Sequence, residues 1–222
     1  MLLISLLIRL SSEGPIIFVQ NRVGLNGRHF SIYKFRSMVA KSGKKQEPSL
    51  TREGDVRITA VGRWLRKFKL DELPQFYNVL RGDMSLVGPR PKLQQYVEPR
   101  SLHFRPGITG AATIVFRSEE EILRQIDAVQ LDRFYLHRIK PLKERIDLRY
   151  MRSATVWSDL GLIMKTLKVA FEPARLPGSF RVLQDPKQNQ PTRSKKAGAR
   201  IVQAEASRGV LAEADCELAV VE

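Results

Sequence analysis

The sequence of 222 residues is poor in cysteine and histidine and has no long apolar run. Its single cysteine, Cys216, excludes a disulfide within the chain, and the paired Cys and His spacings of a zinc site are absent. The most apolar stretch, Met1 to Leu10, is interrupted by Arg9 and is far shorter than the roughly 20 residues of a membrane-spanning helix. This stretch also lacks the basic start and the small-residue cleavage site of a signal peptide. It is instead typical of a short helix that lies in a membrane interface.

Negative charge is also scarce, because 38 Lys and Arg stand against 23 Asp and Glu, a net charge of +15. Residues 1–172 hold 30 of the basic and 17 of the acidic side chains, so +13 of the excess lies before residue 173. A surface of this kind attracts polyanions such as nucleic acid, anionic lipid headgroups or phosphorylated substrates. Charge alone does not choose among these partners.

The pattern along the chain predicts an α+β fold, a predominantly helical single domain with one β-hairpin. Strands are expected over 16–22 and 29–36, with Gly24 and Gly27 beside the turn. Helices are expected over 60–67, 75–80, 93–97, 119–126, 131–139, 142–151 and 155–171, and turn-rich loops over 39–55 and 105–110. The apolar side of the last helix is expected to pack mostly on the core. Residues 173–222 have the composition of a disordered tail.

One stretch between Asp55 and Pro91 concentrates the chemistry. Two adjacent carboxylates, Asp71 and Glu72, precede a helix in which Pro74 suits the first turn and Gly82 suits the end. Acidic residues are common at helix starts, and helix grammar alone favours a purely structural role for this pair. The alternative is a nucleophilic carboxylate beside a phosphate-binding surface, since basic residues flank the pair on both sides.

Several basic residues are candidates for phosphate contacts. Two prolines enclose Arg90 and restrict the backbone, which suits a guanidinium that must hold phosphate oxygens with both of its arms. Lys34 and Arg36 are two residues apart, so their side chains project from the same face of the strand expected over 29–36. Arg63 lies on the polar side of the helix expected over 60–67. The structural alternatives are a tight surface turn for Arg90, a solvated edge strand for Lys34 and Arg36, and an ordinary solvated helix face for Arg63.

These residues also carry a resemblance. The segment TAVGRWLRKFKLDELPQFYNVLRGDMSLVGPRP resembles the core of the bacterial sugar transferase family, the monotopic phosphoglycosyl transferases that act on polyprenol phosphate. Upstream, GPIIFVQNRVGLNGRHFSIYKFRSM resembles the hairpin of the family, and downstream RPGITG matches a further block. The resemblance covers about residues 14–171 and implies a membrane-associated transferase domain over 14–172. It leaves residues 1–13 as the remnant of a membrane-associated apolar segment and 173–222 as the tail.

The resemblance implies an enzyme that transfers a sugar-1-phosphate from a nucleoside diphosphate sugar, expected to be a UDP-sugar, to undecaprenyl or another polyprenol phosphate. This reaction initiates exopolysaccharide, O-antigen or glycan assembly at the cytoplasmic face of the bacterial inner membrane. Asp71 is the implied nucleophile, forming a covalent phosphosugar–aspartate intermediate, with Glu72 beside it. Asp71 and Glu72 would also hold Mg²⁺, the expected cofactor. The phosphate contacts would come from Arg90, Lys34, Arg36, Arg63 and Arg117.

The chain departs from the family pattern in two places. Many members continue RPGITG with L-A-Q-V-N-G-R, whereas this chain reads AATIVFR, so Arg117 keeps the place of the arginine while the Gln and Asn are missing. A different sugar donor is the expected consequence. The family also begins with a longer apolar segment than Met1 to Leu10, which predicts weak, salt-sensitive membrane binding that a restored upstream arm would strengthen.

Two rival functions remain from the residues alone. A basic nucleic-acid-binding module would explain the charge, but the aromatic and basic strands, zinc finger and recognition helix of such modules are not found. We therefore expect no nucleic acid among the partners, which would be the sugar donor, the polyprenol phosphate and the lipid surface. A non-catalytic membrane scaffold is the second rival, and the intact Asp71–Glu72 pair argues against it. Self-association is left open.

Overall fold

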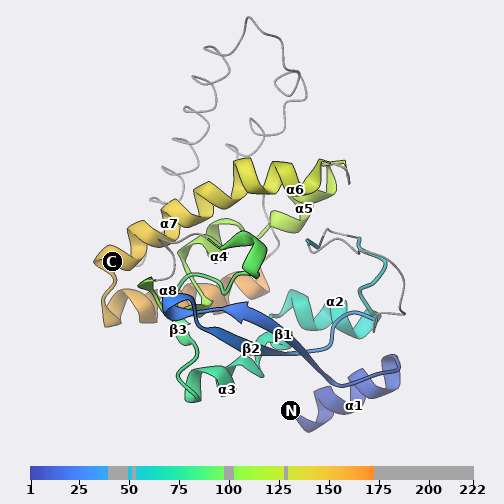
Figure 1. Ribbon diagram of the computed structural model, residues 1–222. Helices are drawn as coiled ribbons and strands as arrows, with labels where there is room; N and C mark the ends of the chain where they lie inside the picture. The colour runs from blue at the N-terminus through green and yellow to red at the C-terminus, as the bar shows by residue number, and fades with distance from the viewer. Residues whose placement is uncertain (40–49, 52–53, 98–102, 128–129, 173–222) are drawn as a thin grey trace, which may run out of the picture.

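The computed structural model describes residues 1–39, 50–51, 54–97, 103–127 and 130–172 (Figure 1). The expected loop over 39–55 falls largely outside this part of the chain, as does the expected tail over 173–222. The strands are β1 (Ile17–Val23), β2 (His29–Phe35), β3 (Ser85–Val87) and β4 (Gly107–Thr109). The helical elements are α1 (Leu2–Ser11), η1 (Leu25–Gly27), α2 (Ala60–Lys67), η2 (Leu70–Glu72), α3 (Gln75–Leu80), η3 (Gln94–Tyr96), α4 (Ala111–Val115), α5 (Glu119–Arg124), α6 (Leu131–Phe134), η5 (Tyr135–Ile139), α7 (Lys140–Ser153) and α8 (Val156–Phe171).

The mixed, mostly helical architecture and the hairpin are confirmed. β1 and β2 pair antiparallel, with Ile17 opposite Phe35 and Val23 opposite His29. The turn between them includes Asn26 and Gly27 at φ values of 54° and 77°, a left-handed conformation that glycine and asparagine adopt most readily. In Figure 1 α3 lies below the hairpin, and α4, α6 and α7 lie above it.

The expectation of a loop at RPGITG is wrong, because Gly107–Thr109 forms the strand β4. It pairs in parallel with β3, joining Ser85 to Gly107 and Val87 to Thr109. A Cβ atom at Gly107 would lie 2.1 Å from the backbone nitrogen of Gly88, so only glycine permits this close approach. Strands of three residues are too short to show a period of two in the sequence. The short helix α4 that follows was not anticipated either.

The segment after α5 is also more continuous than expected. The pattern predicted two helices over 131–139 and 142–151, with Pro141 at the start of the second, and this place of Pro141 is confirmed. The structure instead runs α6 directly into the π-helix η5 and then α7, with Pro141 in the first turn of α7. Proline is tolerated there because the backbone N–H groups of a first helical turn need no partner within their own helix. The result is the long rod at the top of Figure 1.

Two groups of buried apolar side chains hold these elements. The larger cluster has 15 buried members, all but Val87 from residues 111–162. The smaller cluster joins Ile8 of α1, Phe35 of β2 and Leu65 of α2. Thr59 caps the start of α2, where its side chain accepts a hydrogen bond from the backbone N–H of Gly62 at 2.9 Å, as the sequence predicts.

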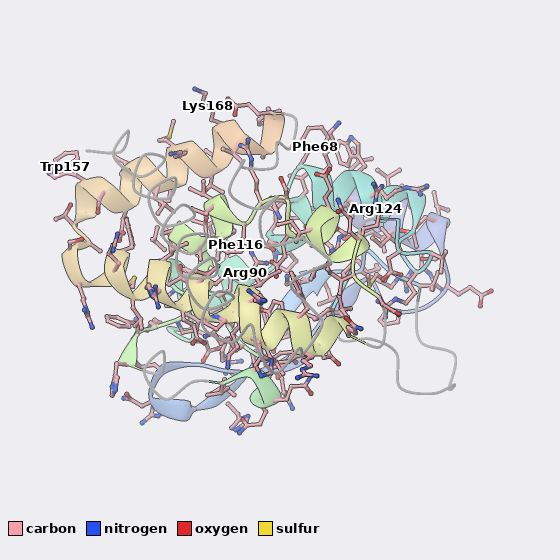
Figure 2. All side chains as sticks on the ribbon, turned by 90° about the horizontal axis from the view of Figure 1, so that it is seen from above. Phe68, Arg90, Phe116, Arg124, Trp157 and Lys168 are labelled. Atoms are coloured by element: carbon pink, nitrogen blue, oxygen red, sulfur yellow. The ribbon has the colours of Figure 1, made fainter. Side chains whose placement is uncertain are left out.

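The expectation that the apolar side of α8 packs on the core is wrong for most of that side. Trp157, Met164 and Phe171 are 79%, 59% and 76% exposed, and only Ile163 of the predicted side contacts the core. The helix is turned so that Leu162 is fully buried and Thr166 meets Thr109 of β4 at 2.8 Å between hydroxyl oxygens. Figure 2 shows Trp157 and Lys168, near the two ends of α8, pointing away from the body. In the described ranges no helix is both long and apolar enough to cross a membrane.

Candidate active site

The carboxylate pair lies on η2, a single turn of 3₁₀-helix. Lys69 enters this turn at a φ of 57°, and the chain stays helical through Leu73 and Pro74 into α3. The side chain of Asn78 ties α3 to the hairpin, donating to the carbonyl of Ser31 at 2.8 Å and accepting from the N–H of Tyr33 at 3.2 Å. This connection fixes η2 beside β2, so the pair faces the strand that carries Lys34.

Glu72 is buried and ion-paired with two cations. Its Oε1 accepts hydrogen bonds from Lys34 Nζ at 3.3 Å and from an Nη atom of Arg90. Burial raises the pKa of Glu72, but the charges of Arg90 and Lys34 more than offset it and hold the pKa well below its ordinary value. Glu72 is therefore ionised at neutral pH and joins two of the predicted phosphate-binding residues.

Arg90 reaches the pair from the segment after β3. The carbonyl of Pro89 accepts from the N–H of Gly107 at 3.0 Å, which anchors this segment to β4. The charge of Glu72 raises the pKa of Arg90, so the guanidinium stays cationic despite burial. Burial lowers the pKa of Lys34, against the opposing influence of Glu72. Side-chain exposures of 33% for Arg90 and 22% for Lys34 leave both cations accessible.

Asp71 contrasts with its neighbour. It is only 6% exposed, and its Oδ1 has no hydrogen-bond partner in the described part of the chain. Burial raises the pKa of Asp71, and the adjacent charge of Glu72 raises it further, while Lys34 and Lys69 act in the opposite direction. A desolvated carboxylate is more basic than a solvated one, and a more basic oxygen is a better nucleophile.

The other three predicted phosphate contacts lie elsewhere. Arg36 turns toward the end of α1, where one Nη atom donates to the carbonyls of Ser12 at 2.6 Å and Ile8 at 3.3 Å. The last carbonyl groups of a helix accept no backbone hydrogen bond from within the helix, so this guanidinium caps the C-terminal end of α1. Arg63 is exposed on α2. Arg117 lies 3.6 Å from Glu172, after α8. The structure thus brings together Asp71, Glu72, Lys34 and Arg90.

A cavity of about 230 Å³ opens beside Arg90, and sequence reasoning missed most of its lining. The lining combines basic, acidic and aromatic side chains from β1, α2, η3, α5, η5 and α7, among them Arg22, Arg66, Lys92, Tyr96, Glu119, Tyr135, Lys140, Lys143, Glu144 and Asp147. Some of these charges neutralise one another, as Lys143 does with Glu119 at 2.7 Å and Lys92 with Glu144. They are scattered over more than a hundred residues, and the sequence indicated only Arg66, which lies on the polar side of the helix expected over 60–67.

Asp147 is the buried carboxylate on the α7 side of this cavity. Its Oδ1 accepts from the backbone N–H of Ala112 at 2.9 Å. Burial raises the pKa of Asp147 to about 6, although this hydrogen bond lowers it. Nearby, the π-helix η5 presents Tyr135, whose ring meets Tyr96 edge to face with centroids 5.5 Å apart. Isolated π-helical turns often occur at functional sites.

Comparison with known proteins places this geometry in a family. Residues 1–173 match the model described as "Bacterial sugar transferase". The chain belongs to the bacterial sugar transferase family. The match includes the segment that carries Asp71, Glu72 and Arg90, in which Glu72 is ion-paired with Arg90.

Curated relatives agree with this assignment. A "UDP-N-acetylgalactosamine-undecaprenyl-phosphate N-acetylgalactosaminephosphotransferase" of Aeromonas hydrophila is 38% identical over 179 residues, covering 76% of this chain and 38% of its own length. A "UDP-glucose:undecaprenyl-phosphate glucose-1-phosphate transferase" of Escherichia coli is 38% identical over 76% of this chain and 35% of its own length. A protein of the same description from Caulobacter vibrioides is 37% identical over 75% of this chain and 61% of its own length. The sugar transferase chain thus spans one to two thirds of these relatives.

Proposed function

We propose that this protein transfers a sugar-1-phosphate from a UDP-sugar to undecaprenyl phosphate, at the cytoplasmic face of the bacterial inner membrane. Asp71 carries the proposal, as a desolvated carboxylate without a hydrogen-bond partner for Oδ1 in the described chain, next to a Glu72 that binds two cations. The descriptions of the relatives from Aeromonas hydrophila and Escherichia coli support both substrates. The product would begin the assembly of an exopolysaccharide, O-antigen or other glycan.

In the first step, an oxygen of Asp71 attacks the phosphorus that bears the sugar. A bond forms between this oxygen and phosphorus, and the bond from phosphorus to the bridging oxygen breaks. UMP leaves with that electron pair, and the sugar phosphate remains as an acyl phosphate on Asp71. The high pKa of the Asp71 carboxylate favours the attack, because a more basic oxygen is a better nucleophile.

In the second step, an oxygen of undecaprenyl phosphate attacks the same phosphorus. The bond to Asp71 breaks, the carboxylate is regenerated, and the diphosphate-linked sugar leaves with the lipid. No proton has to be removed from the attacking phosphate oxygen, which is already anionic at neutral pH. The residues around the pair therefore act mainly by positioning and by neutralising charge.

Lys34 and Arg90 are suited to that task. Both contact Oε1 of Glu72, so Glu72 holds two cations at the edge of the reacting group before any substrate arrives. A planar guanidinium binds two phosphate oxygens at once, whereas the Lys34 ammonium acts as a point charge. The part of the donor that does not react would extend into the cavity beside Arg90, where further cations line the wall.

Mg²⁺ belongs to the proposal as well. In the described residues no group of three or more His, Cys, Asp or Glu side chains is placed to hold a metal ion. Mg²⁺ commonly uses only one or two protein carboxylates and takes its other ligands from phosphates and water. The ionised Glu72 and the adjacent Asp71 would supply these one or two carboxylate ligands. When bound, the ion would neutralise charge on the diphosphate.

Membrane contact would come from α1 and α8. Exposed apolar side chains cover much of both helices, namely Leu2, Leu3, Leu6, Leu7 and Leu10 on α1, and Val156, Trp157, Leu160, Met164, Leu167 and Phe171 on α8. Short amphipathic helices with such faces lie in the headgroup region. This arrangement would bring the buried site close to an acceptor whose hydrocarbon part stays in the bilayer.

The test is UMP release by the purified protein in detergent, with UDP-glucose, UDP-galactose and UDP-N-acetylgalactosamine as donors. We expect release with at least one donor, and a mass increase of one sugar phosphate on the peptide that contains Asp71 when the acceptor is omitted. Asp71→Asn should abolish both while the thermal unfolding temperature stays within a few degrees. Asp159→Asn, the same substitution on α8, should keep full activity. Undiminished UMP release by Asp71→Asn would exclude Asp71 as the nucleophile.

A further inference from the structure

Gln75 is a buried amide that the mechanism above does not use. It is 1% exposed, and its Nε2 has no hydrogen-bond partner among the described residues. Such orphaned groups are rare in folded proteins, because a buried donor without an acceptor loses its hydrogen bonds to water and gains none. The only buried oxygen in the same condition in the described chain is Oδ1 of Asp71.

The donor of Gln75 and the acceptor of Asp71 are four residues apart on one helical path. Leu73 and Pro74 both have right-handed helical dihedral angles, so the turn of η2 continues into α3. Backbone hydrogen bonds from Leu73 to Leu70 and from Phe76 to Leu73 span the junction. These bonds join residues three apart, so the path is a tight 3₁₀ turn. Asp71 and Gln75 are 6% and 1% exposed, so both side chains lie on the inner side of this turn.

Asn78, the other buried amide side chain on α3, has a structural role. Asn78 is fully buried, and it uses both its oxygen and its nitrogen to hold the hairpin. Gln75 makes no comparable side-chain hydrogen bond to the described fold. Its amide therefore contributes little to holding the structure together, although it is buried only four residues from the reacting carboxylate.

We propose that Gln75 is a positioning residue for Asp71. In the reacting state its Nε2–H donates to Oδ1 of Asp71, so that the two orphaned atoms satisfy each other. This hydrogen bond holds the plane of the carboxylate and directs Oδ2 toward the phosphorus. After the attack, the same amide holds the carbonyl oxygen of the acyl phosphate. A small misplacement of a reacting atom costs a large factor in rate, which makes such an orienting contact valuable.

The inference rests on the proposed function and is tested first by kinetics. Gln75→Met keeps the length of the side chain and removes its amide. We expect kcat for UMP release to fall by roughly 10- to 100-fold, with the KM for the UDP-sugar changed by less than about two-fold, because the donor itself is not touched. The unfolding temperature should stay equal or rise, since no hydrogen bond of the described fold is lost. Gln75→Glu, which replaces the donor by an acid, should lose at least as much activity.

Asn78→Ala is the matched control on the same helix. It should lower the unfolding temperature, because it leaves the carbonyl of Ser31 and the N–H of Tyr33 without partners, while kcat per folded molecule is affected less than in Gln75→Met. A wild-type kcat in Gln75→Met would overturn the proposal. A rise in KM at constant kcat would also overturn it, since the amide would then contact the donor. So would a loss of stability as large as that of Asn78→Ala.

A spectroscopic measurement separates this inference from the proposed function. In a spectrum of ¹⁵N-labelled glutamine side chains, the Gln75 amide is the signal that Gln75→Met removes. A hydrogen bond to a carboxylate moves this signal and slows the exchange of its protons with water. We expect both effects when the protein is bound to a UDP-sugar analogue that cannot react, and we expect both to be lost in Asp71→Ala under the same conditions. An unchanged Gln75 signal in Asp71→Ala would refute the positioning role even if the enzyme is fully active.

Discussion

The region before residue 98 and the region after residue 102 are stabilised in different ways. The first contains the small apolar cluster of Ile8, Phe35 and Leu65, and five of the nine buried polar or charged side chains in the described chain: Arg36, Asp71, Glu72, Gln75 and Asn78. The second contains 14 of the 15 members of the large cluster. Buried polar groups stabilise a fold weakly but restrict its geometry, whereas apolar packing supplies most of the free energy. Asp71 and Glu72 thus lie in the first region, where buried polar contacts fix the geometry. The apolar cluster of the second region supplies most of the stability.

The largest effect should come from breaking the ion pairs of Glu72. Glu72→Gln leaves the partly buried cations Arg90 and Lys34 against a neutral amide, and we expect the free energy of unfolding to fall by about 3 kcal/mol. Chemical denaturation in detergent measures this change. Glu120→Gln is the control, because Glu120 pairs with Arg66 but is 43% exposed, and such a pair contributes about 1 kcal/mol or less. Equal losses of unfolding free energy in the two variants would mean that the ion pairs of Glu72 stabilise the fold no more than an exposed pair does.

A second pair of substitutions compares the apolar clusters directly. Leu162→Ala in α8 and Leu65→Ala in α2 each remove a fully buried leucine and should cost roughly 2–5 kcal/mol of stability. They should differ in activity, because α2 contacts η2, which carries Asp71 and Glu72, whereas Leu162 packs in the large cluster. We expect kcat per folded molecule to fall several-fold in Leu65→Ala and to stay near wild type in Leu162→Ala. Equal decreases in kcat would mean that the region before residue 98 determines the geometry of the site no more than the region after residue 102 does.

The same division explains what the sequence could predict. The hairpin, the cap of α2 by Thr59 and the start of α8 at Thr155 depend on residues close in sequence, so their patterns were sufficient. Thr155 forms a reciprocal cap with Ser158. β4 and α4 were missed because three to five residues give too short a period. The exposure of α8 was missed because a periodic apolar side indicates amphipathicity but does not say whether protein or membrane covers it.

The candidate site was predictable only where one motif carried it. Asp71, Glu72 and Arg90 lie within a single recognised block, and the structure joins them. Arg36 and Lys34 looked equivalent because they are two apart on a strand, yet Arg36 lies just beyond β2 and turns to the end of α1. Gln75 stands in the same block, but only its burial and the missing partner for Nε2 in the described chain distinguish it from a surface glutamine.

Arg90→Lys tests whether the site needs the shape of a guanidinium or only its charge. The substitution keeps the cation next to Glu72 but removes the planar pair of donors. We expect kcat/KM for UMP release to fall by roughly 10- to 100-fold, within the range for loss of one oriented donor to a developing charge. Arg63→Lys is the matched control, since Arg63 is exposed on α2 and should tolerate the change within about two-fold. A comparable loss in Arg63→Lys would restore Arg63 to the site.

The smallest effect concerns the exposed side of α8. Most of its apolar side chains are open to solvent in the described chain, although Phe171 at its end meets Phe68 with ring centroids 5.6 Å apart. Trp157 is 79% exposed at one end of this helix, and Lys168 lies near the other end with a side-chain exposure of 76%. If this side lies in the headgroup layer, the two side chains contribute by different forces. Tryptophan contributes by apolar burial, which salt does not screen, whereas lysine contributes through attraction to anionic lipid, which salt does screen.

Co-sedimentation with vesicles separates these two forces. Trp157→Ala should weaken binding about five-fold on neutral and anionic vesicles alike, equivalent to about 1 kcal/mol of partly buried apolar surface. Lys168→Gln should weaken binding by a similar factor on anionic vesicles at low salt only, since each basic residue near such a surface contributes about 1 kcal/mol. Val56→Ser, at a residue that is 95% exposed outside α8, should leave binding unchanged. If Trp157→Ala and Val56→Ser bind equally well, α8 does not contact the membrane, and its apolar side must be covered by protein instead.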